Sequence, residues 1–113
     1  NFTVNTYYVL PTTSGTPVNE VCVDKSGDES TAIIRLTAVP NAAQYWVLVG
    51  DSAGGNNTYN NKVPANSTSD TKVRVRVKNG KQNFVQYSYA TCVNCSSNTN
   101  FAPFSAAVGF TCD

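Results

Sequence analysis

The stretch Lys72-Val73-Arg74-Val75-Arg76-Val77-Lys78 decides the fold class of this chain. Its valines occupy every second position and its cations the positions between, a period of two that places the valines on one face of a strand. Asn79-Gly80 follows directly, and this dipeptide readily takes positive φ in a tight turn. Asn83 to Thr91 alternates again, with a valine and two tyrosines on one face. We therefore predict a β-hairpin whose two strands share one sheet.

The same alternation recurs in other stretches of the chain. Thr31 to Val39 places alternate apolar residues on one side, and Gln44 to Gly50 is apolar on both faces, as expected for a central strand. Further short strands bounded by Gly-, Pro- and Asn-rich turns are predicted over Phe2–Leu10, Val18–Asp24, Tyr59–Val63 and Phe104–Cys112. Seven or so short strands in this arrangement are typical of an antiparallel β-sandwich.

The composition supports an all-β class and a single domain. Fifteen Val stand against three Leu, two Ile and no Met, and residues branched at Cβ suit a pleated surface better than a helix. No run of ten or more residues has helical periodicity. A length of 113 residues fits one domain, which we assign to residues 1–113.

Three stretches resemble the fibronectin type III module or a close immunoglobulin-like relative. Thr31 to Ala42 resembles the second strand of that family with its following turn, and Tyr45 to Val49 resembles the third. Phe101 to Val108 is similar to the loop and the start of the last strand. The chain departs from the family in lacking the second-strand Trp, and in placing a predicted Asn79-Gly80 hairpin where the family crosses between sheets. The resemblance implies a seven-strand sandwich and, by analogy, adhesion or modular protein contact.

Four cysteines, Cys22, Cys92, Cys95 and Cys112, indicate disulfides and therefore an exported protein. In the sandwich order Cys92 and Cys95 lie at one pole and the other two near the opposite pole. This order predicts the pairs Cys22–Cys112 and Cys92–Cys95. The Cys92-Val93-Asn94-Cys95 spacing also occurs in redox dithiols, but no helix follows it to lower a thiol pKa. A four-cysteine zinc site is less favoured because only one close pair is present.

Catalysis, cofactors and nucleic-acid binding find no support in the residues present. The absence of His removes Ser-His-Asp and Cys-His systems and every His-ligated metal site. A net charge of +1 gives no general attraction toward nucleic acid. No stretch reaches the ~20 apolar residues of a membrane span. Asp24 to Glu29 is rich in oxygen ligands but lacks an EF-hand pattern, so we interpret it as an acidic turn rather than a calcium loop.

Two surfaces are candidates for interaction. One is a stripe of cations formed by Lys72, Arg74, Arg76, Lys78 and Lys81. It would suit an acidic polysaccharide, a phosphate surface or a neighbouring subunit, or it would be a solvated face or protect a sheet edge by its charge. An opposing acidic patch would allow head-to-tail contact between copies, and its members are Glu20, Asp24, Asp28 and Glu29. Aromatic residues that would stack on sugars, unless they form the core, are Tyr7, Tyr8, Tyr45, Trp46, Tyr59, Tyr87 and Tyr89.

Four Asn-x-Ser/Thr sequons make N-glycosylation plausible in an exported chain. They begin at Asn1, Asn56, Asn66 and Asn94. Asn56 and Asn66 lie in the polar middle of the chain, where a glycan is accommodated most readily. Asn94 is a poorer acceptor because it lies between two cysteines.

We expect a non-enzymatic extracellular or cell-surface module, either one repeat of an adhesin or the subunit of a filament. Its partners would be other copies of the chain or cell-surface proteins. The apolar opening strand over residues 1–10 would either complete its own sheet or exchange with a neighbouring copy, since strand addition uses backbone groups available at any sheet edge. Residues 11–17, from Pro11 to Pro17, would form the hinge. The alternative is a carbohydrate-binding module, whose partners would be glycans.

Overall fold

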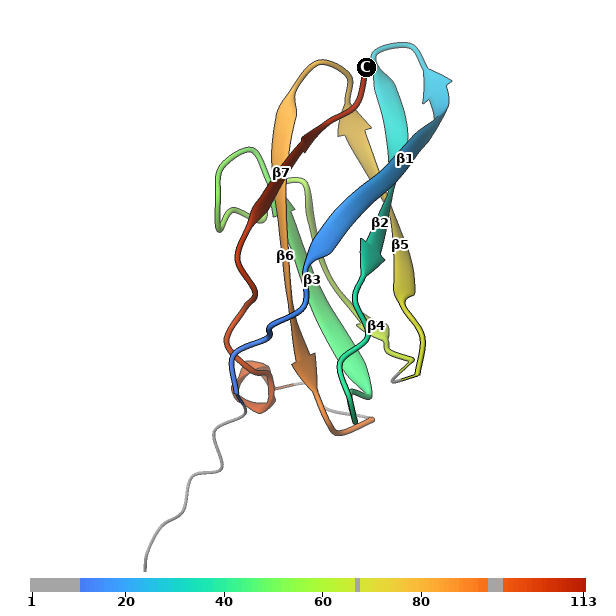
Figure 1. Cartoon of the computed structure of the whole chain (residues 1–113). Helices are drawn as coiled ribbons and strands as arrows, with labels where there is room; N and C mark the ends of the chain where they lie inside the picture. Colours follow the sequence, from blue (N-terminus) through green and yellow to red (C-terminus); the bar gives the residue numbers. More distant parts are fainter. Residues whose placement is uncertain (1–10, 67, 94–96) are drawn as a thin grey trace, which may run out of the picture.

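The computed structural model describes residues 11–66, 68–93 and 97–113 of the chain. Seven strands and one 3₁₀ turn lie within these residues (Figure 1). Their bounds are β1 Pro17–Ser26, β2 Glu29–Leu36, β3 Gln44–Gly50, β4 Tyr59–Pro64, β5 Thr71–Lys78, β6 Gln82–Ala90, η1 Asn98–Asn100 and β7 Val108–Thr111. The predicted opening strand over Phe2–Leu10 lies outside the described residues.

The strands form two antiparallel sheets that pack against each other as an all-β sandwich, which confirms the predicted class. The first sheet has the order β1-β2-β5, and the second has the order β4-β3-β6-β7. The order places β2 in the middle of the smaller sheet, while β3 and β6 form the centre of the larger one. Figure 1 shows the two layers side by side.

The connection through Asn79-Gly80 corrects the predicted hairpin, because β5 and β6 belong to different sheets. Gly80 does have a positive φ of 77°, but the turn is used to cross the sandwich. The Asn79 N–H donates to the carbonyl oxygen of Asp28, at the β1–β2 turn of one sheet. The Gly80 N–H donates to the carbonyl oxygen of Cys112, just after the last strand of the other sheet. Each amide of the turn therefore bonds to a different layer.

The core lies between the inner faces of the two sheets. The first sheet contributes Ala32, Ile34 and Leu36 from β2 and the three valines of β5, all at most 5% exposed. The second contributes Tyr45, Val47 and Val49 from β3 with Val85, Tyr87 and Tyr89 from β6. The valine periodicity of Lys72 to Lys78 thus predicts the buried face correctly. Tyr45 and Tyr87 meet edge to face, with ring centroids 5.2 Å apart.

The last strand is shorter than predicted, because the segment before it departs from regular pairing. β7 pairs with β6 only over Gln82 to Val85. Ahead of it, Ala102 N–H donates to Tyr89 O and Ser105 N–H to Tyr87 O, with Pro103 between them. The Ser105 hydroxyl accepts the Tyr87 N–H, so a side chain replaces a backbone partner at this edge. Proline cannot donate to a ladder, which limits regular pairing here.

The segment from Pro11 to Thr16 is docked against the body of the sandwich. Thr13 N–H donates to Pro103 O, and the Thr13 side chain is buried. Pro17, the first residue of β1, is fully buried. A Cβ on Gly15 would collide with the Tyr87 hydroxyl, so only glycine fits this close approach. The predicted hinge therefore contacts the body at Thr13, Gly15 and Pro17, while the residues between them are exposed.

The predicted Cys22–Cys112 disulfide is confirmed. It joins β1 to the residue after β7, with the two Cα atoms 5.9 Å apart and a sequence separation of 90. The second predicted pair includes Cys95, which lies outside the described residues. Among the described cysteines there is no free thiol.

Candidate interaction surfaces

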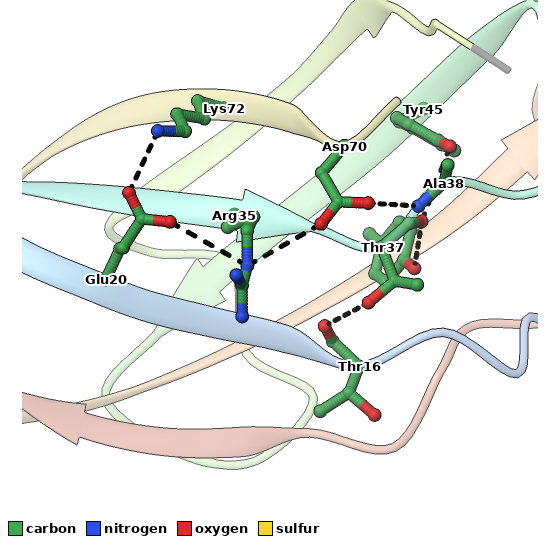
Figure 2. A network of polar contacts seen from close by, with 9 residues as sticks. Thr16, Glu20, Arg35, Thr37, Ala38, Tyr45, Asp70 and Lys72 are labelled. Carbon is green, nitrogen blue, oxygen red and sulfur yellow. Dashed lines mark hydrogen bonds and ion pairs between the residues drawn. The ribbon is translucent and has the colours of Figure 1, made fainter. Parts of the chain in front are cut away.

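The outer face of the β1-β2-β5 sheet carries the predicted cation stripe, and each cation has an acidic partner in the same chain. Arg35 of β2 lies between two carboxylates, with Nε 3.8 Å from Glu20 and 3.7 Å from Asp70 (Figure 2). Lys72 Nζ lies 2.9 Å from the other oxygen of Glu20. Glu20 of β1 thus reaches Lys72 of β5 across the intervening strand.

The remaining cations of the stripe are paired in the same way. Arg76 has its Nε 3.5 Å from Glu29, and its Nη1 donates to Asp24 O and to the Thr31 hydroxyl. The other three pairs are Arg74–Asp24 at 4.0 Å, Lys78–Asp28 at 4.0 Å and Lys81–Asp51 at 3.4 Å. The acidic residues predicted to oppose the stripe therefore lie beside it, and the charges alternate instead of separating into two patches. This removes the segregation that would drive head-to-tail contact.

We call the ion-paired outer face of the β1-β2-β5 sheet the ionic face. At one end of this face, hydrogen bonds of the residues that follow β2 connect it to core tyrosines (Figure 2). Asp70 Oδ1 accepts the Ala38 N–H at 3.0 Å, and the Thr37 hydroxyl donates to Thr16 O at 3.0 Å. Behind them the Tyr87 hydroxyl donates to Thr37 O at 2.8 Å. The Tyr45 hydroxyl accepts the Val39 N–H at 2.9 Å. These bonds end β2 at Leu36, three residues earlier than the alternation predicts.

Burial makes both tyrosine hydroxyls poor acids. Desolvation raises the pKa of Tyr87 to about 12, and the neighbouring Tyr45 adds to this shift. Desolvation also raises the pKa of Tyr45 above its usual value, although the bond from the Val39 N–H opposes the change. Both side chains therefore stay protonated over the physiological pH range and act as neutral hydrogen-bonding groups. This arrangement does not suit catalytic proton transfer near neutral pH.

The outer face of the larger sheet carries a half-buried aromatic cluster. Trp46 of β3 meets Phe101 and Phe104 edge to face, with ring centroids 5.7 Å and 5.0 Å from its own. Lys62 Nζ lies 5.0 Å from the Trp46 centroid and 5.1 Å from that of Phe101. The Trp46 indole N–H donates to Asn60 Oδ1 at 2.8 Å. The cluster fastens the segment after η1 onto the sheet.

The other predicted aromatic candidates have different places in the fold. Tyr45, Tyr87 and Tyr89 are core residues, and Tyr59 is partly buried against the core. Tyr7 and Tyr8 lie outside the described residues. Sequence reasoning named Trp46 but missed Phe101 and Phe104 as its partners. The sequence pattern that could have indicated them is the pair of phenylalanines on either side of Ala102-Pro103. The predicted central strand from Gln44 to Gly50 places Trp46 on the face opposite Tyr45 and Val47, where such rings could meet it.

A surface hollow of about 440 Å³ lies over the ionic face and the edge of β5. Its charged members, Glu20, Lys72 and Arg74, are already in ion pairs. Its apolar members are Ile33, Tyr59, Val63 and Val73. No group of three or more acidic or cysteine side chains that would hold a metal ion is found among the described residues.

Two of the four sequons lie in described loops. Asn56 is exposed between β3 and β4, and its Thr58 hydroxyl donates to the buried Asn83. Asn66 is exposed between β4 and β5, and its Oδ1 accepts from both the N–H and the hydroxyl of Thr68. Asn1 and Asn94 lie outside the described residues. Both described acceptors are therefore on the surface.

Comparisons with known proteins found no relative of this chain. No family model, curated protein or solved structure matches the chain. Within the residues described, no helix has the length and apolar character to cross a membrane.

Proposed function

We propose that this chain is a non-enzymatic structural or adhesive module that works outside the cell. The Cys22–Cys112 disulfide carries this proposal, because it joins the first described strand of a small sandwich to the residue after the last one. Structural disulfides of this kind persist in oxidising compartments. An ion-paired face, neutral buried tyrosines and an aromatic cluster that fastens a loop all serve stability, and none of them prepares a nucleophile or a general base.

A fibronectin type III module is the type of sandwich that we favour. In the constant-type immunoglobulin arrangement, the fourth strand joins the sheet of the first, second and fifth. Here β4 pairs with β3 instead. The crossing between sheets after β5 also removes one of the two departures from the fibronectin pattern seen in the sequence. Both observations support the fibronectin-like alternative over the constant-type immunoglobulin one.

Assembly of copies by strand addition is the form that we propose for the structural role. Four strands lie at sheet edges on the described body, β1 and β5 in the smaller sheet and β4 and β7 in the larger one. An added strand would use the backbone groups of such an edge. The donor would be the apolar opening segment over residues 1–10. The docked stretch from Thr13 to Pro17 would stay with its own body, so that exchange would involve only the residues before it.

Light scattering over a range of concentrations, with electron microscopy of the same samples, tests this assembly. The mass of the oxidised chain should rise with concentration. Val4→Asp, in the alternating apolar positions of the opening segment, should return the mass to that of a monomer. Asn5→Asp adds the same charge at the adjacent polar position and should not. A constant monomeric mass at every concentration would contradict the assembly.

A carbohydrate-binding role is the second candidate, favoured by the half-exposed aromatic cluster with Asn60, Lys62 and Asn98 around it. Lys62 Nζ donates to Asn98 Oδ1 at 2.7 Å while lying over two of the rings. A sugar would have to displace this ammonium group to stack on them. Trp46 is the single Trp of the chain, so its fluorescence reports directly on binding. An unchanged spectrum across a panel of neutral and acidic oligosaccharides would reject this role.

A further inference from the structure

The two ends of the described chain leave the sandwich at opposite poles. The Thr13 N–H bonds to Pro103 O, just after the η1 turn, and β1 then runs the length of the body toward its turn with β2. The carboxyl end lies at the pole of that turn (Figure 1). There Gly80 N–H donates to Cys112 O, next to the bond from Asn79 N–H to Asp28 O. A pull on both ends would therefore act along the strands.

The weakest element in such a pull is β7. It has four residues, and it pairs only with the first four residues of β6. The segment before it is held by two separated backbone bonds, and one of its partners is a side chain. Hydrogen bonds alone would therefore transmit little load from the body to the carboxyl end.

The Cys22–Cys112 disulfide provides a covalent route around β7. Cys22 lies on the inner side of β1 opposite Ala32, and Cys112 is 1% exposed. The Asn19 side-chain N–H donates to Cys22 Sγ at 3.2 Å, so the bond is held within the body. A covalent path through residues 11–22, the two sulfur atoms and Asp113 bypasses β7 and every strand between the two cysteines.

We propose that this disulfide is a covalent bypass that carries tension between the two ends and keeps the sandwich folded under it. This inference rests on the proposed structural function, because tension matters only in a module held at both ends. Residues 17–22 are already extended in β1, so straightening them releases little length. The residues between Cys22 and Cys112, a sequence separation of 90, are outside the force path. Without the bond they would add about 300 Å, at about 3.4 Å per residue.

Single-molecule pulling of the full chain between two terminal handles tests the bypass. The oxidised chain should show no extension step of about 300 Å up to the force that breaks the handles. The Cys22→Ser/Cys112→Ser double variant should show that step. A step of about 300 Å in the oxidised wild-type chain would overturn the proposal, and this result is decisive even where the double variant does not fold.

Phe110→Ala is the matched control on β7. Phe110 is the buried residue of that strand, and its loss should loosen β7 from β6. In the oxidised chain the force–extension trace should nevertheless match that of the wild type, because the load does not pass through β7. A new extension step in oxidised Phe110→Ala would place β7 in the force path and reject the bypass.

The pulling result and the assembly result are independent. A monomeric chain that shows no step of about 300 Å would support the bypass and contradict strand addition. A chain that assembles but shows this step would support strand addition and contradict the bypass.

Discussion

The outer faces of the two sheets are stabilised in different ways. On the β1-β2-β5 sheet, long charged side chains meet in pairs that remain exposed, such as Arg74 and Asp24 with 67% and 73% of their side chains accessible. On the larger sheet, Trp46 and its aromatic neighbours are half-buried and touch ring to ring. The first face pairs opposite charges that stay in contact with water, whereas the second buries apolar surface and holds the segment after η1 against the sheet.

The difference follows from the medium around each contact. Exposed ion pairs gain little, because water screens the charges and two flexible side chains must be ordered, and measured values are about 0–1 kcal/mol. Aromatic contacts bury apolar area and add about 0.5–1.5 kcal/mol for their geometry. We therefore expect substitutions on the aromatic face to cost more than those on the ionic face, although the ionic face has more contacts.

The largest loss of stability should follow removal of the disulfide that links β1 of the smaller sheet to the end of the larger sheet. Cys22→Ser/Cys112→Ser should lower the free energy of unfolding by about 4–5 kcal/mol, because the unfolded chain is no longer cross-linked. Urea unfolding followed by circular dichroism measures it. The Cys22→Ser single variant serves as the control and should match the double variant. An unchanged midpoint would show that the link contributes nothing.

Trp46→Ala should have the next largest effect, with a loss of about 2–3 kcal/mol. Removing a fully buried Trp costs about 3–5 kcal/mol, and Trp46 is only half-buried. Trp46→Phe keeps an aromatic ring and should lose about half as much. The urea midpoints of the two variants measure the difference. Equal midpoints for Trp46→Ala and the wild type would remove the contrast between the two faces.

A substitution in the core between the two sheets should cause an intermediate loss of stability that depends on pH. Tyr87→Phe removes the bond to Thr37 O and should cost about 1 kcal/mol at neutral pH. The pKa of Tyr87 is about 12 when folded and about 10 when unfolded. The unfolded chain therefore releases this proton first, and the stability present below pH 10 is lost as the pH rises toward 12. Thermal unfolding at pH 9 to 11 should show a shallower decline in Tyr87→Phe, and parallel declines would contradict it.

The smallest effect should come from the ionic face itself. Arg74→Gln should change the free energy of unfolding by less than about 0.5 kcal/mol, because its single pair is long and exposed. Arg35→Gln should cost more, up to about 1 kcal/mol, since Arg35 lies between Glu20 and Asp70. Unfolding at low and high salt checks both, and the difference should shrink as salt screens the charges. A loss at Arg74 as large as that at Trp46 would reverse the comparison.

Local patterns predicted the strands and their buried faces well. The period of two in β5 fixed which residues face the core, and the apolar run from Gln44 to Gly50 matched a central strand. The Cys22–Cys112 pair also followed from strand order. Each of these features depends on a short stretch of chain or on the order of such stretches along it.

Features that depend on distant partners could not be predicted in the same way. Asn79-Gly80 fits a hairpin locally, but pairing of β5 with β2 and of β6 with β3 decides that the turn crosses between sheets. The ion pairs depend on β2 lying between β1 and β5, which sets Glu20 within reach of Lys72. Trp46 meets rings that are more than fifty positions away in the sequence. The residues next to each partner in the sequence do not specify which distant residue it contacts.

The crossing turn has a consequence for the chemical ageing of the protein. An Asn-Gly pair deamidates when the glycine nitrogen attacks the asparagine side-chain carbonyl and closes a succinimide ring. Here the Gly80 N–H is held by Cys112 O at 2.6 Å, and Asn79 Oδ1 accepts the Ser30 hydroxyl at 2.6 Å. The Gly80 nitrogen must leave its partner before it can attack, and the Ser30 hydroxyl holds the Asn79 side chain in one orientation. The fold therefore slows succinimide formation at Asn79-Gly80, because the attacking nitrogen is held by a hydrogen bond that ties the turn to the end of the other sheet.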